Sequence, residues 1–138
     1  MVGLVLVSHN RALSMAAADL ARGVSADTDI PIIAAGGVGD NHKELGTDAT
    51  DILEAIEKVY SDDGVMILMD LGSAIISSKM AIEMLDEEKA KKVVLCSGAI
   101  VEGAVGAAVQ IAAGSNMDDI KEEAINALAG KQAEIGDI

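Results

Sequence analysis

The sequence contains almost no aromatic side chains. Tyr60 is the only aromatic residue among 138, and Phe and Trp are absent. The core must therefore be built from aliphatic residues, alanine and the seven methionines, which favours closely spaced elements with small contact residues. A chain of this length that is 51% hydrophobic can bury its own core. We therefore expect residues 1–138 to form a single domain.

Basic residues and cysteines are also scarce. Ten Lys and Arg against 23 Asp and Glu give a formal net charge of -13, which opposes binding to nucleic acid or to an anionic membrane surface and favours partners with basic patches. The single Cys96, within an apolar run, cannot form an intramolecular disulfide. No segment reaches the roughly twenty apolar residues of a membrane span, and the N-terminal run lacks the basic flank of a secretory signal. These features predict a cytoplasmic protein that binds neither nucleic acid nor membranes.

Patterns that would hold a metal ion or a nucleotide are missing as well. The two histidines, His9 and His42, are far apart in the sequence, and together with Cys96 they cannot assemble a usual zinc site. Nothing matches the phosphate-binding pattern G-x-x-x-x-G-K-[ST], and the glycines that begin at Gly36 do not complete G-x-G-x-x-G. A kinase that binds ATP by itself is therefore disfavoured, and no cofactor is expected. Other proteins must bring any phosphoryl donor and acceptor.

What the sequence does contain is an alternation of strand and helix patterns. Short apolar runs predict buried strands, and segments with apolar residues at helical spacing follow them. The predicted strands cover residues 2–8, 30–35, 65–69 and 92–96. The predicted helices cover residues 11–24, 49–60, 74–85, 101–113 and 117–129. We expect Thr47 to cap the second helix, and Ser115 or Asn116 to cap the last.

Alternating strands and helices imply parallel pairing through right-handed crossovers. The expected fold class is α/β, with an open, mainly parallel sheet of strand order 2-1-3-4 and helices on both faces. Functional residues in such sheets gather beyond the carboxyl ends of the strands, where the strand order reverses. In this order that place lies between the first and third strands, which end at His9 and Asp70. The topology therefore predicts an imidazole and a carboxylate across one crevice.

His9 is the leading candidate for chemistry. It stands between a buried strand and a helix N-terminus, where unpaired backbone N–H groups attract anions. Imidazole can act near neutral pH as a nucleophile and then as a leaving group, which suits a phosphoryl carrier. The alternative is that His9 merely caps the helix or forms a local hydrogen bond. His42 lies among charged residues and is interpreted as a surface residue.

Asp70, Gly72 and Ser73 follow the third predicted strand. A carboxylate beside His9 would fix its tautomer and leave the other ring nitrogen to attack. Capping of the next helix is an equally good interpretation of Asp70, and one carboxylate can do both. Gly72 and Ser73 offer N–H groups and a hydroxyl to a transferring phosphoryl group. The glycines of the long, turn-rich segment from Gly36 to Asp48 are better explained by a tight loop than by phosphate binding.

Four segments taken together resemble the mannose-type enzyme IIA family, and within it the phosphotransferase subunits of phosphoenolpyruvate-dependent dihydroxyacetone kinases. They are Val5–His9, Gly36–Gly37, Gly46–Ala49 and Met69–Ala74, and the resemblance spans nearly the whole chain. It implies that His9, contacted by Asp70, takes a phosphoryl group from the histidine-containing phosphocarrier protein HPr. The acceptor implied is ADP held on the nucleotide-binding kinase subunit, which then phosphorylates dihydroxyacetone. A homodimer and a separate phosphocarrier are also implied.

Other functions remain as alternatives. A mannose-type sugar transporter IIA component would share the same site but serve a different acceptor protein. A receiver-like domain phosphorylated on Asp70 would need a metal site, and no acidic pair follows the first strand. A hydrolase with a transient phosphohistidine would need several arginines around the phosphate, and the chain has only Arg11 and Arg22. A non-catalytic interaction module is the remaining alternative. The sequence does not decide which ring nitrogen of His9 reacts.

Overall fold

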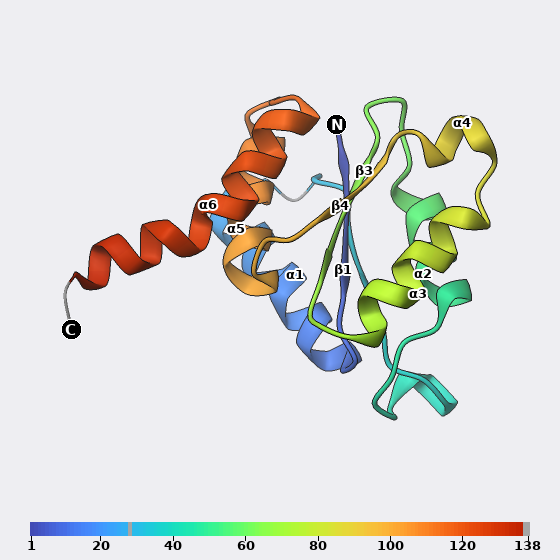
Figure 1. Ribbon diagram of the computed structural model, residues 1–138. Helices are drawn as coiled ribbons and strands as arrows, with labels where there is room; N and C mark the ends of the chain where they lie inside the picture. Colours follow the sequence, from blue (N-terminus) through green and yellow to red (C-terminus); the bar gives the residue numbers. More distant parts are fainter. Residues whose placement is uncertain (28, 137–138) are drawn as a thin grey trace.

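The computed structural model describes residues 1–27 and 29–136. Its strands form one parallel sheet of order β2-β1-β3-β4 (Figure 1). The strands are β1 (Gly3–Val7), β2 (Ile32–Ala35), β3 (Val65–Met69) and β4 (Val93–Cys96). The α/β class and the predicted strand order are therefore confirmed.

Helices cover both faces of the sheet. They are α1 (Arg11–Ser25), η1 (Asp40–His42), α2 (Ala49–Val59), α3 (Ser73–Glu83), α4 (Glu87–Ala90), α5 (Ile100–Ala112) and α6 (Met117–Ile135). Helices α1, α5 and α6 pack on one face, and α2 and α3 on the other (Figure 1). No helix within the described residues is long and apolar enough to cross a membrane.

Burial of the sheet on both faces explains why the strands appear as continuous apolar runs. In β1, Leu4 and Leu6 belong to the core under α1 and α5, whereas Val5 and Val7 belong to the core under α2 and α3. The small residues of α5 pack in the first of these cores, with Ala104 and Ala107 fully buried. Packing inside the molecule thus accounts for the buried small residues of this helix.

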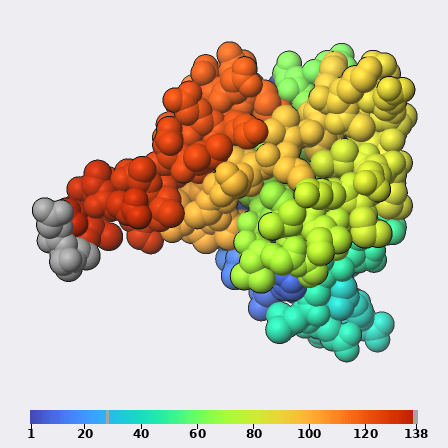
Figure 2. Space-filling model, in the orientation of Figure 1, coloured from blue at the N-terminus to red at the C-terminus, as the bar shows by residue number. Residues whose placement is uncertain are grey.

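Two helix boundaries differ from the sequence-based expectation. Thr47 does not cap α2, because Asp48 occupies the N-cap position and its carboxylate accepts from the Thr50 N–H at 2.9 Å. Helix α6 is capped by Asn116, as one of the two expected candidates, but it runs to Ile135 rather than to residue 129. Figure 2 shows its C-terminal half projecting from the body. From residue 128 to 136 every residue is exposed, so no apolar periodicity marks the end of the helix.

The outer edge of β2 is occupied by arginine side chains. The carbonyls of alternate residues of β2 accept hydrogen bonds from N–H groups of β1. The carbonyls of the residues between them face away from β1. Arg22 donates to the outward carbonyl of Ile32, and Arg11 Nη1 donates to that of Ala34 at 3.5 Å. Arg11 Nε donates to the next such carbonyl, Gly36, at 2.7 Å. The acceptors that an added strand would need are therefore already engaged.

Candidate functional site

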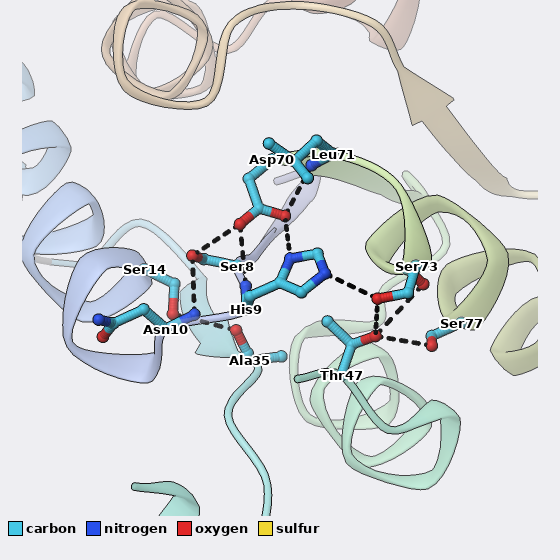
Figure 3. Close-up of polar contacts among 10 residues, drawn as sticks. All are labelled: Ser8, His9, Asn10, Ser14, Ala35, Thr47, Asp70, Leu71, Ser73 and Ser77. Carbon is cyan, nitrogen blue, oxygen red and sulfur yellow. Dashed lines mark hydrogen bonds and ion pairs between the residues drawn. The ribbon is translucent and has the colours of Figure 1, made fainter. Parts of the chain in front are cut away.

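The sheet brings the ends of β1 and β3 together at its carboxyl edge. Val7 is in register with Met69, and the Asp70 N–H donates to the Val7 carbonyl at 3.0 Å. His9 and Asp70 consequently leave the sheet side by side, as the strand order predicts (Figure 3). The two residues are 61 positions apart in the chain.

Asp70 accepts four hydrogen bonds from neighbouring groups (Figure 3). Its Oδ1 accepts from His9 Nδ1 at 2.9 Å and from the Leu71 N–H at 2.7 Å. Its Oδ2 accepts from the His9 N–H at 2.9 Å and from Ser8 Oγ at 3.0 Å. Partial burial by itself would raise the pKa of Asp70, but these hydrogen bonds favour the charged form and lower its pKa below the ordinary value. Asp70 is therefore ionised at neutral pH.

The ionised carboxylate sets the tautomer of His9. A carboxylate can only accept, so Nδ1 must carry the proton in the 2.9 Å contact with Asp70, and Nε2 of the neutral ring is left with its lone pair. Ser73 Oγ lies 2.7 Å from Nε2 and donates to it. The His9 side chain is 27% exposed. The ring is thus fixed by Asp70 at Nδ1, and its Nε2 lies at the rim of the sheet in contact with the Ser73 hydroxyl.

The turn before α3 supplies further donors at this place. Gly72 adopts φ +51°, a region that favours glycine, and no side chain caps α3. The capping alternative for Asp70 therefore does not apply, because its carboxylate contacts His9, Ser8 and the Leu71 N–H instead. In the described part of the chain the N–H groups of Gly72 and Ser73 have no backbone or side-chain acceptor. These donors stand at the start of α3, beside the Ser73 hydroxyl that contacts Nε2.

Ser8 and Thr47 are polar partners of the site to which the sequence analysis gave no role in its chemistry, Thr47 being expected to cap a helix. Ser8 is 1% exposed; its Oγ donates to Asp70 and accepts from the Asn10 N–H at 3.1 Å. The sequence feature that could have indicated Ser8 is a serine at the end of a fully buried strand, next to a histidine. Thr47 Oγ1 lies 2.8 Å from Ser77 Oγ and 3.2 Å from the carbonyl oxygen of Ser73. Nothing in the local pattern of a helix start indicates this distant contact.

The loop from Gly36 to Asp48 is fastened to the site by backbone contacts. A Cβ at Gly36 (φ +114°) would lie 1.6 Å from the Ser8 carbonyl oxygen, so only glycine fits there. The Gly46 N–H donates to the His9 carbonyl at 3.0 Å. The tight-loop interpretation of these glycines therefore agrees with the structure.

Arg11 anchors the same loop to α2. Its Nη2 contacts both carboxylate oxygens of Asp51 at 2.8 Å, and Asp51 also accepts from the Gly36 N–H at 2.8 Å. Arg22 is engaged at the edge of β2. Both arginines are thus used in structural contacts, which weakens the hydrolase alternative.

His42 lies apart from this arrangement. It is exposed in the η1 turn, and its Nδ1 is 3.1 Å from the carbonyl oxygen of Gly37. The receiver-like alternative is weakened too, since each carboxylate oxygen of Asp70 already accepts two hydrogen bonds. Within residues 1–27 and 29–136, no group of three or more His, Cys, Asp or Glu side chains is placed to hold a metal ion.

Comparison with known proteins gives consistent matches along the chain. Proteins named PEP-dependent dihydroxyacetone kinase, phosphoryl donor subunit DhaM are 42% identical over 136 residues in Pantoea ananatis and 40% identical over 136 residues in Escherichia coli. These matches include 99% of this chain, which spans only 29% of the length of each relative. In Listeria innocua, a protein named PEP-dependent dihydroxyacetone kinase 2, phosphoryl donor subunit DhaM is 35% identical over 126 residues, covering 91% of this chain and 98% of that protein.

A solved structure and a family pattern agree with these relatives. The crystal structure of a protein described as unknown function protein EF1359 matches with a TM-score of 0.80 and 31% identity, covering 91% of this chain and 95% of that one. The sequence pattern of the EIIA-man family, described as PTS system fructose IIA component, matches residues 3–133. With this pattern along almost its whole length, and with a sheet of the expected order, the chain belongs to the mannose-type enzyme IIA family.

Proposed function

We propose that the chain is a phosphohistidine carrier in which Nε2 of His9 accepts and returns the phosphoryl group. The observation that carries the proposal is the Nδ1–H bond to Asp70, which leaves an unprotonated Nε2 at the rim of the sheet. Asp70 is the orienting residue. The N–H groups of Gly72 and Ser73, with the Ser73 hydroxyl, support the phosphoryl oxygens.

The transfer step needs no proton to leave His9. The Nε2 lone pair attacks phosphorus, the N–P bond of the donor breaks, and its electron pair returns to the donor imidazole. His9 keeps its Nδ1 proton, so positive charge develops on the ring opposite the Asp70 carboxylate, 2.9 Å away. In the onward step an acceptor oxygen attacks phosphorus, and the pair of the Nε2–P bond returns to Nε2. The carboxylate therefore stabilises the intermediate in both directions.

The partners proposed are HPr as donor and, as acceptor, ADP bound on the nucleotide-binding subunit of a dihydroxyacetone kinase. The names of the relatives support the kinase system, because they describe phosphoryl donor subunits of such kinases. Exposed leucines flank the site in sequence: Leu71 follows Asp70 and is 65% exposed, and Leu45 precedes Gly46 and is 73% exposed. Apolar side chains beside a reactive nitrogen suit docking of a protein rather than of a small substrate.

The test is a reconstituted relay. The chain is incubated with phosphoenolpyruvate, enzyme I and HPr, and the phosphorylated residue is identified by mass spectrometry. We expect phosphate on His9 that is labile to acid and stable to base. Label that is released by hydroxylamine would indicate an aspartyl phosphate on Asp70 and contradict the proposal. No label at all would favour a non-catalytic interaction module.

A second stage of the relay identifies the acceptor. The phosphorylated chain is divided between the ADP-loaded kinase subunit with dihydroxyacetone and the acceptor component of a mannose-type transporter. We expect phosphate to move to the kinase subunit. The family description as a fructose IIA component gives the transporter role a specific basis, and exclusive transfer to the transporter component would establish it instead.

A homodimer completes the proposal. Helix α6 exposes Ile125, Leu128 and Ile135, three apolar residues whose spacing places them on one face of the helix. A second copy that covers this surface would bury these apolar side chains. Light scattering should give a dimer for the unaltered chain and a monomer for Leu128→Asp. A monomeric unaltered chain would contradict this part of the proposal.

A further inference from the structure

A chain of hydroxyl groups continues from Nε2 into the molecule (Figure 3). Ser73 Oγ is 2.7 Å from Nε2 of His9, Thr47 Oγ1 is 3.4 Å from Ser73 Oγ, and Ser77 Oγ is 2.8 Å from Thr47 Oγ1. Thr47 comes from the loop before α2, whereas both serines belong to α3. These three hydroxyls therefore connect two separate segments to the reactive nitrogen.

The proton of each hydroxyl has a defined direction. In the neutral ring, with the proton on Nδ1, Nε2 can only accept, so Ser73 donates to it. Two oxygens of Ser73 face Thr47. One is the carbonyl oxygen, at 3.2 Å, and the other is the hydroxyl oxygen, whose proton is already donated to Nε2. Both are acceptors, so Thr47 donates to Ser73 and its own oxygen is free to accept from Ser77. The Ser77 proton thus points to Thr47, the single Thr47 proton is shared between the carbonyl and hydroxyl oxygens of Ser73, and the Ser73 proton points to Nε2.

We propose that Thr47 is a positioning residue of the transfer site, which, with Ser77 behind it, holds the Ser73 hydroxyl as a donor aimed at Nε2 and then at the phosphoryl oxygen. This inference rests on the proposed function. When the Nε2–P bond forms, the lone pair of Nε2 is used and Ser73 loses its acceptor. A phosphoryl oxygen on the same nitrogen is an acceptor only, so the Ser73 proton turns to it while Thr47 and Ser77 stay in place. The hydroxyl groups of Ser73, Thr47 and Ser77 are thus in place before the negative charge of the phosphoryl group reaches the site.

A purely structural role for Thr47 makes different predictions. In that case its hydroxyl would only fasten the loop to α3, and its loss would lower stability without changing the environment of Nε2. The Ser73 side chain is exposed, so without Thr47 its hydroxyl is free to rotate towards water. The proposal therefore predicts an effect on His9 itself, 38 residues away from Thr47 in the sequence.

The first experiment observes the unphosphorylated protein. Nitrogen-15 NMR of the His9 ring is recorded for the unaltered chain, Thr47→Val, Thr47→Ser and Thr50→Val. We expect the Nε2 resonance to move downfield in Thr47→Val, as for a nitrogen that has lost a donor, and to return in Thr47→Ser. Thr50 is exposed on α2, and its side chain makes no hydrogen bond with the other described residues, so Thr50→Val is the matched control.

The second experiment measures transfer from phosphorylated HPr. Loss of one neutral hydrogen bond predicts a fall in maximal rate on the order of fivefold in Thr47→Val, with the KM for phosphorylated HPr unchanged. Ser77→Ala, which removes the donor to Thr47, should lower the rate by a smaller factor of about two. It also tests the proposal if Thr47→Val fails to fold.

The outcomes separate the inference from the proposed function. An unchanged Nε2 resonance together with an unchanged maximal rate in Thr47→Val overturns the inference. The inference is also overturned if Thr47→Ser restores neither the Nε2 resonance nor the maximal rate, because the effect of Thr47→Val would then come from the methyl group of Thr47 and not from its hydroxyl. If the unaltered chain takes no phosphate from HPr, the proposed function fails, and the nitrogen-15 measurement still decides whether Thr47 directs Ser73.

Discussion

His9 and His42 are the same side chain in two different settings. His42 is exposed in a short turn, and the hydrogen bond of its ring within the described residues is to Gly37, five residues away. His9 has a partner on each ring nitrogen, Asp70 and Ser73, from segments 61 and 64 residues away. The comparison teaches that a reactive imidazole needs partners that only the tertiary fold can supply. The Gly37 carbonyl also accepts from Nδ1 of His42, so His9 is distinguished by the charge of its Nδ1 partner and by the hydroxyl at its Nε2.

The largest effect that would test this comparison is the removal of each imidazole in turn. We expect His9→Ala to abolish phosphate transfer, because no other group in the site replaces Nε2 as nucleophile. His42→Ala should transfer at the unaltered rate. The relay with HPr measures both, and circular dichroism checks that both variants fold. Normal transfer by His9→Ala, or loss in His42→Ala alone, would reverse the roles assigned to the two histidines.

A smaller effect is expected when the orienting carboxylate becomes an amide. Asp70→Asn places an NH₂ group among four donors, so it cannot keep all the hydrogen bonds that the carboxylate accepts. We expect transfer to slow by about 100-fold without being abolished, and the free energy of unfolding to fall by about 1–3 kcal/mol. Single-turnover kinetics and urea unfolding measure these two quantities. An unchanged rate would remove Asp70 from the mechanism.

The next variant removes the buried support of Asp70. Ser8→Ala deletes the hydroxyl that donates to Asp70 and accepts from the Asn10 N–H. We expect a rate reduction of about threefold and a stability loss of about 1 kcal/mol, because Asp70 keeps its other three donors. Ser78→Ala is the matched control: Ser78 is also buried, and its hydroxyl has no partner among the described residues. Equal effects of the two substitutions would show that the Ser8 contact does not matter.

The smallest effect concerns acid pH. Because the pKa of Asp70 is lowered in the folded protein, its carboxylate contributes stability that is fully present above its unfolded pKa and is lost as the pH falls towards the folded pKa. We expect the stability difference between the unaltered chain and Asp70→Asn to be constant down to about pH 5 and to shrink below about pH 4. Urea unfolding at several pH values measures it. A difference that grows in acid would contradict the lowered pKa.

Much of the architecture could be predicted from the sequence because it follows from local patterns. Apolar runs and helical spacing predicted four strands and the main helices, and their alternation predicted parallel pairing; the expected order 2-1-3-4, which alternation alone does not fix, then placed His9 beside Asp70. The short helix α4 was missed because one turn of charged residues carries no apolar periodicity. The last turns of α6 were missed because their residues are exposed and show no apolar periodicity.

Partner choice among polar side chains could not be predicted in the same way. Asp48 and Thr47 are adjacent and both are good helix caps, and only the position of α3 decides that Thr47 turns to Ser77 and Asp48 caps α2. Arg11 likewise looked like an ordinary first residue of a helix. Its contacts to Asp51 and Gly36 depend on where the next strand and helix are placed.

The arginine-covered flank of β2 has a consequence for how the molecule meets others. Because the outward carbonyls along this flank already accept from arginines, the edge of β2 offers few acceptors to an added strand, which opposes edge-to-edge pairing with other chains. For the proposed phosphoryl carrier, which must separate from its partners after each transfer, such an edge limits persistent association through the sheet.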